Sequence, residues 1–173
     1  MTAGQADRLI RPLALVAGLC AVGLALSHWS LPSTVGTLGA EVRFSATPTG
    51  ELSVSHVDPF LVGRDLHPGM RKAAEGSVSV TNLTAIEQRL RLRALPSATD
   101  LDDLLEVSVL AGGKRLYRGP LGGLRHWTHA SAALASGETV KLGVRASLPA
   151  TARHGYTGRI EDVQLELRSD TPR

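Results

Sequence analysis

Two histidines three residues apart are the clearest candidates for metal chemistry in this sequence. His126 and His129 flank Trp127, and on a helix this spacing would place both imidazoles on one side. A zinc site needs three or more protein ligands, and no nearby carboxylate or cysteine completes the set. The chain also lacks a His-Glu-x-x-His pair, so no metallopeptidase mechanism can be assigned. We interpret the segment as an exposed loop, and we predict no catalytic residue, no metal and no other cofactor.

A short acidic cluster raises the possibility of calcium binding, which favours several oxygen ligands in one loop. The cluster consists of Asp100, Asp102, Asp103 and Glu106. Its spacing lacks the glycine and the distal glutamate of a helix-loop-helix calcium site. We therefore interpret it as the solvated start of a single helical turn within residues 97–105, capped by Thr99 or Asp100.

Three arginines alternate along one segment and would share one face of a strand. They are Arg89, Arg91 and Arg93. One interpretation is a solvated face whose charges discourage pairing with another sheet edge. The other is a basic stripe that makes a salt-sensitive contact with an anionic surface polymer or extracellular DNA. The sequence leaves both open.

Composition limits the class of protein. The chain has 173 residues, enough for one domain plus a short extension, and its 43% of apolar residues can supply a core. The net charge of +3 comes from basic residues spread over the whole length, and aromatic residues make up only 3%. We therefore predict no specific nucleic-acid ligand, because neither a basic footprint nor a base-stacking surface is visible. The single cysteine excludes a disulfide framework and a multi-cysteine zinc site.

The first forty residues have the pattern of an export signal. Arg8 and Arg11 precede a stretch without charged residues that runs to Glu41. Its dense apolar part, residues 13–26, would span roughly 21 Å as a helix, short of the ~30 Å hydrocarbon core. We predict a signal peptide removed by a signal peptidase; the alternative is an uncleaved membrane anchor over residues 12–31. Either places residues 41–169, the predicted folded domain, outside the cytoplasm, secreted or held at the cell surface.

Beyond residue 40 the apolar residues recur with a period of two, which is typical of strands with one buried face. The strongest segments are 77–81, 88–93, 105–109, 140–146 and 163–168. Weaker candidates are 41–46 and 51–56, joined by a Thr-Pro-Thr-Gly turn, and 114–118, joined to 105–111 through Gly112-Gly113.

About eight short strands with no long helix between them predict an all-β fold. We expect an antiparallel β-sandwich of immunoglobulin-like or jelly-roll type, preceded by the signal or anchor helix. The expected core consists of Val78, Val80, Leu90, Leu92, Val107, Val109, Val140, Leu142, Val144, Val163, Leu165 and Leu167.

The order of the segments resembles the TasA/CalY (camelysin-like) family of secreted bacterial β-sandwich proteins. The resemblance covers roughly residues 36 to 168. It rests on the strand 42–46, the Asp-Leu-His-Pro-Gly turn at 65–69, the strand 77–82 ending in Asn, the segment 134–149 and the turn and strand 156–167. The chain departs from the family at Ala46, where an acidic residue is usual, and in its many surface arginines.

The resemblance implies a non-enzymatic structural role in a biofilm matrix or cell-surface coat. In fibre-forming members the N-terminal segment of one subunit adds as a strand to the next. The corresponding donor here is residues 28–46, in which Leu38, Ala40, Val42, Phe44 and Ala46 share one face. The expected partner is a second copy or another envelope or matrix protein. The alternative is a monomeric accessory domain, tethered by residues 12–31, that binds an envelope protein.

Overall fold

The computed structural model describes residues 38–96 and 101–172. Nearly all of the predicted leader therefore lies outside the described residues, as do the proposed helix caps Thr99 and Asp100. Within the described residues, no helix is both long enough and apolar enough to cross a membrane.

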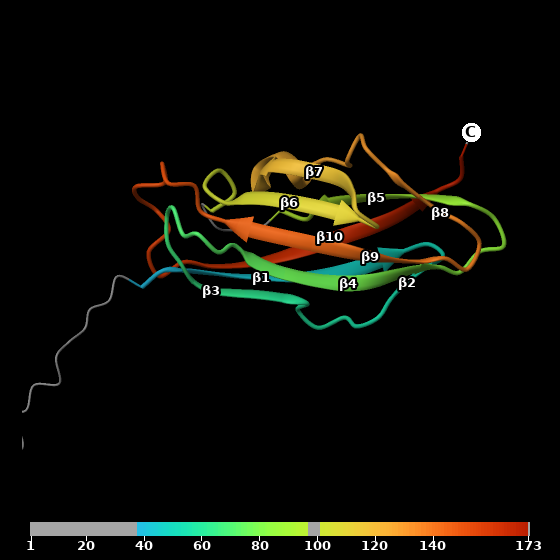
Figure 1. The fold of residues 1–173 in the computed structure, drawn as a ribbon, viewed down its shortest axis with the longest axis horizontal. Helices are drawn as coiled ribbons and strands as arrows, with labels where there is room; N and C mark the ends of the chain where they lie inside the picture. Colours follow the sequence, from blue (N-terminus) through green and yellow to red (C-terminus); the bar gives the residue numbers. More distant parts are fainter. Residues whose placement is uncertain (1–37, 97–100, 173) are drawn as a thin grey trace, which may run out of the picture. The chain divides into compact units, whose positions relative to one another are not determined.

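In this part of the chain ten strands form two five-stranded sheets, which share one hydrophobic core. Sheet A has the order β3 (Leu61–Leu66), β1 (Ala40–Thr49), β10 (Ile160–Asp170), β5 (Gln88–Ala94) and β8 (Ala132–Leu134). Sheet B has the order β2 (Leu52–Val54), β4 (Ala74–Asn82), β9 (Thr139–Ser147), β6 (Glu106–Ala111) and β7 (Lys114–Pro120). A short 3-10 helix, η1 (Leu121–Arg125), follows β7. In Figure 1 the long strands of both sheets lie roughly along the same axis, the horizontal one in that view.

The all-β prediction is confirmed, and so is the predicted core. Each of the twelve predicted core residues is at most 9% exposed, because the alternating pattern places every second side chain of each strand between the sheets. The Gly112-Gly113 hairpin is also confirmed, between β6 and β7. Both glycines have positive φ angles, 55° and 84°, which the two-residue turn requires at both central positions.

Two strands were missed, because neither shows a clean period of two. In β3 the alternation breaks at Asp65, which is exposed next to exposed Arg64 and has a φ angle of 56°. The other, β8, is only three residues long and pairs with the first part of β5. About eight strands were expected, and the described residues contain ten.

The way the strands pair differs from the expectation of an antiparallel sandwich in one respect. The predicted Thr-Pro-Thr-Gly turn joins β1 and β2, but these two strands do not pair, because β1 belongs to sheet A whereas β2 pairs with β4 in sheet B. The chain thus passes from one sheet to the other at Gly50, which has a φ angle of 73°. The expectation of purely antiparallel pairing fails for β1 and β10, which are parallel. The residues between these two strands form most of the domain, so the parallel pair needs no crossover helix.

A buried asparagine connects the two sheets at one end of the domain. Asn82 ends β4 of sheet B, and its side-chain amide nitrogen lies 3.1 Å from the carbonyl oxygen of Leu134 in β8 of sheet A. The same nitrogen lies 2.9 Å from the carbonyl oxygen of Ala135 and 2.8 Å from that of Ile86. Its Oδ1 accepts a hydrogen bond from the backbone nitrogen of Thr84 at 2.9 Å. Asn82, the residue that the sequence places at the end of a strand, therefore holds the two loops that connect the sheets. One loop follows β4 and the other follows β8.

Candidate functional site

The predicted donor residues lie in the core of the domain's own sheet. Ala40, Val42, Phe44 and Ala46 are at most 1% exposed, whereas Leu38, just before β1, is 71% exposed. On one side β1 pairs with β10 in parallel, and on the other it pairs with β3 in antiparallel orientation. In a single copy the slot between β3 and β10 is therefore filled by the chain's own β1. A donor role requires this strand to leave that slot.

A hydrogen-bonded carboxylate holds the start of β1. The backbone nitrogen of Gly39 donates to Oδ1 of Asp65 at 3.0 Å, and His67 Nε2 lies 2.9 Å from the same oxygen. The hydrogen bond from Gly39 is the main cause that lowers the pKa of Asp65, and the contact with His67 lowers it further. Asp65 therefore ties the left-handed turn in β3 to the residue that directly precedes β1.

The three arginines predicted to share a face do so, on the outer side of β5. Arg93 forms an ion pair with Glu166 of β10, with Nε 2.6 Å from Oε2, and Arg91 Nε lies 3.6 Å from Asp170 Oδ2. Arg89 is exposed. The neighbouring strand thus supplies carboxylates opposite two of the three charges.

An aromatic side chain also covers part of this stripe. Trp127 lies with its ring centroid 4.7 Å from the guanidinium carbon of Arg93 and 4.3 Å from that of Arg168, which is cation–π distance. The Trp127 loop is held along the edge of β5, because the backbone nitrogen of Thr128 donates to the carbonyl oxygen of Leu92 at 2.9 Å. Much of the charge of the arginine stripe is therefore engaged within the domain.

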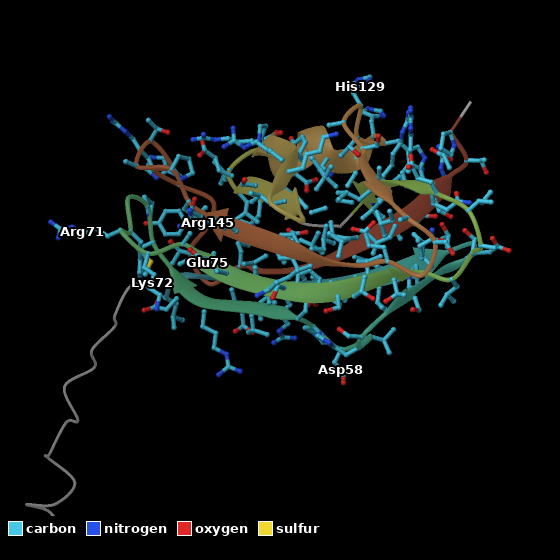
Figure 2. The ribbon with its side chains drawn as sticks, turned by 45° about the vertical axis from the view of Figure 1, so that its right-hand side comes forward. Asp58, Arg71, Lys72, Glu75, His129 and Arg145 are labelled. Carbon is cyan, nitrogen blue, oxygen red and sulfur yellow. The ribbon has the colours of Figure 1, made fainter. Side chains whose placement is uncertain are left out.

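The two histidines do not form a helical pair. The 3-10 helix ends at Arg125, and His126 and His129 are exposed on either side of buried Thr128. Figure 2 shows His129 at the tip of its loop, directed away from the sheets. Among residues 38–96 and 101–172 no three His, Cys, Asp or Glu side chains gather in a way that could hold a metal ion.

Within the acidic cluster, Asp102 is buried and has a structural role. It is 8% exposed and forms an ion pair with Arg125 at the end of η1, while its carbonyl oxygen accepts a hydrogen bond from Gly122. The predicted helical turn is present as a hydrogen bond from the nitrogen of Leu105 to the carbonyl oxygen of Leu101, at 2.8 Å.

The outer face of sheet B carries a basic surface that the sequence did not reveal. Its main hollow, about 690 Å³, is lined by Arg71, Arg115, Arg118 and Arg145, together with Glu106 and serines. A second hollow of about 380 Å³ adjoins it at Leu110 and Arg145 and adds Lys141. We call the two together the basic groove, defined by Arg71, Arg115, Arg118, Lys141 and Arg145. Arg71 lies in the loop before β4, and β7 and β9 contribute two charges each at spaced positions, so no run of basic residues marks the groove in the sequence.

Comparison with known proteins gives this chain no relatives from which a role could be transferred. No protein-family model matches it, and no curated protein sequence is similar to it.

Proposed function

We propose that this chain is a non-enzymatic structural protein of the extracellular matrix or cell envelope, exported by its N-terminal leader, and that copies associate by exchanging β1. The observation that supports the proposal is the position of β1. It is the first strand after the leader, and it occupies a slot between β3 and β10 with four apolar side chains buried. Because it is the terminal strand of the domain, it can leave and enter this slot without threading the chain.

An exchanged β1 would make the same contacts in a neighbour that it makes in its own domain. Its alternating apolar face and its parallel register with β10 fit the same slot in any copy. The change in direction at Gly50, which is exposed and has a φ angle of 73°, is the natural hinge. Exchange in which each copy gives its strand to the next does not close on itself and therefore extends into a fibre.

A reversible lock on β1 tests this proposal. Ser45 and Gln164 are register partners on the outer face of β1 and β10, so the Ser45→Cys/Gln164→Cys variant, with Cys20→Ser, can close a disulfide across the pair. We expect oxidised monomers to form no fibres by electron microscopy, and reduction to restore them.

The control places the same chemistry where no exchange is proposed. Ser79 and Lys141 are partners on the outer face of sheet B, so the Ser79→Cys/Lys141→Cys variant, again with Cys20→Ser, should assemble whether oxidised or reduced. Fibres that form equally well from the oxidised β1 lock would refute the exchange. Deleting residues 28–46 is unsuitable as a test, because it removes a core strand as well as the proposed donor.

A second function is favoured by the same filled slot. Because β1 completes sheet A within one chain, the domain needs no second copy to be folded, as suits a membrane-tethered accessory domain that binds an envelope protein. A chain recovered from cells that still begins near Met1 and stays monomeric at high concentration would favour this function. A chain that has lost its predicted signal peptide and assembles would favour the structural function.

A further inference from the structure

The basic groove combines several charged strand positions into one surface. On the outer face of sheet B, Glu75 pairs in register with Arg145, Arg145 with Ser108, and Ser108 with Arg118. Adjacent strands lie about 4.8 Å apart, so the backbones at Arg145 and Arg118 are separated by roughly 10 Å across β6. The next row contains Gly143, where a Cβ atom would meet nothing within 4 Å. This missing side chain leaves the floor of the groove open.

Most of the positive charge in the groove is not neutralised by neighbouring side chains. Arg145 forms an ion pair with Glu75 at 2.7 Å, and both side chains are more than half exposed. Figure 2 shows these two side by side on the sheet, with Arg71 at the same end of the domain. Within the described residues Arg115, Arg118 and Lys141 form no ion pair, and all three are exposed. The arginine stripe on sheet A differs, because carboxylates and Trp127 engage it.

The lining also carries groups that suit a ligand with hydroxyls. Glu106 lies in the same hollow as Arg118, and Ser108 and Ser147 lie on the floor. A carboxylate accepts hydrogen bonds from hydroxyl groups and repels anionic groups of every kind, so Glu106 suits a part of the ligand that carries hydroxyls, and serine hydroxyls both donate and accept. No aromatic side chain lines either hollow among the described residues, so single-stranded nucleic acid would find no stacking surface. A polymer that carries both carboxylates and hydroxyls matches this mixture best.

We propose that the basic groove binds a linear acidic polysaccharide, whose carboxylates pair with Arg115, Arg118 and Arg145 and whose hydroxyls bind Glu106 and the serines. The groove does not include β1, so the inference stands whether or not copies exchange that strand. It also places polyanion binding on the sheet opposite Arg89, Arg91 and Arg93.

Binding of alginate oligomers, which are polyuronates, tests the inference on the exported protein at 50 mM NaCl by calorimetry. The groove variant is Arg115→Gln/Arg118→Gln. Its matched control is Arg64→Gln/Arg89→Gln, which removes the same charge from two exposed positions on the outer face of sheet A. We expect the groove variant to bind at least tenfold more weakly, the control to stay within twofold of the natural protein, and the affinity to fall as salt rises.

Several results would overturn the inference. Equal losses in both variants would show that binding follows net charge alone. A loss confined to the control variant would move the site to sheet A. Absence of detectable alginate binding by the natural protein would remove the polysaccharide as ligand, and tighter binding of oligo-dT than of alginate would replace it with nucleic acid. Neutral dextran should not bind, and binding as tight as that of alginate would also count against charge recognition.

Discussion

Replacing Asn82 with alanine should destabilise the domain more than any other single polar substitution at the junction of its sheets. Its amide nitrogen carries two hydrogens shared among three carbonyl oxygens, and its Oδ1 accepts from the backbone nitrogen and the hydroxyl of Thr84. About four hydrogen bonds are therefore made at once. At roughly 1 kcal/mol each, and with the bond to the carbonyl of Leu134 buried, Asn82→Ala should cost about 3 to 4 kcal/mol. This is a large part of the 5–15 kcal/mol stability that is typical of a domain.

Urea unfolding followed by circular dichroism measures this cost. The matched control is Ser136→Ala, which removes one exposed hydrogen bond, to the carbonyl oxygen of Thr84, at the same junction and should cost about 1 kcal/mol or less. Asn82→Asp keeps the acceptor but turns a carboxylate toward three carbonyl oxygens, so we expect it to be at least as destabilising as alanine. If Asn82→Ala costs no more than Ser136→Ala, or if Asn82→Asp is tolerated, the hydrogen-bond network does not hold the junction as argued.

Two further perturbations probe the packing of the sheets and the entry to β1. In Gly76→Ala the new Cβ would lie 2.3 Å from the carbonyl oxygen of Phe60, so we expect thermal unfolding to show a loss of stability of about 2 to 3 kcal/mol. In the control Gly143→Ala the new Cβ meets nothing within 4 Å, so stability should change by less than about 0.5 kcal/mol. Equal effects of the two substitutions would contradict this account. Because the pKa of Asp65 is lowered in the folded state, its charge contributes stability that is present above the unfolded pKa, near 3.8, and is lost as the pH falls through the folded value. Asp65→Asn, which tolerates the same left-handed backbone, should therefore lower the melting temperature at pH 7, and this difference should shrink as the pH falls below 3.8 and through the folded pKa. A difference that does not depend on pH would point to packing instead.

The core could be predicted from the sequence because burial in a strand follows a simple alternation. Residues such as Val78, Leu92 and Leu165 lie at positions where every second side chain must face the same way, whatever the neighbouring strand is. The Gly112-Gly113 hairpin was equally predictable, because two adjacent positive φ angles favour glycine. The short strands β3 and β8 were not, because the exposed Asp65 interrupts one pattern and three residues are too few to show the other.

Strand pairing could not be predicted from the local sequence pattern, for a different reason. Alternation states which residues of a strand face inward, but nothing in it states which strand lies alongside. The Thr-Pro-Thr-Gly segment has the composition of a turn, yet whether it closes a hairpin or carries the chain to the opposite sheet depends on contacts with distant residues. The parallel neighbours β1 and β10 are the clearest case, since they stand at opposite ends of the domain's sequence.

The same division holds for the functional surfaces. The sequence alone was enough to predict that Arg89, Arg91 and Arg93 share one face, because all three belong to one strand. Only the tertiary structure placed Glu166, Asp170 and Trp127 against that face, and only it gathered Arg115, Arg118 and Arg145 into one groove. Which side chains of one strand share a face depends only on their spacing along the chain and on backbone geometry. A surface that spans several strands depends on register, which long-range packing of the whole core determines.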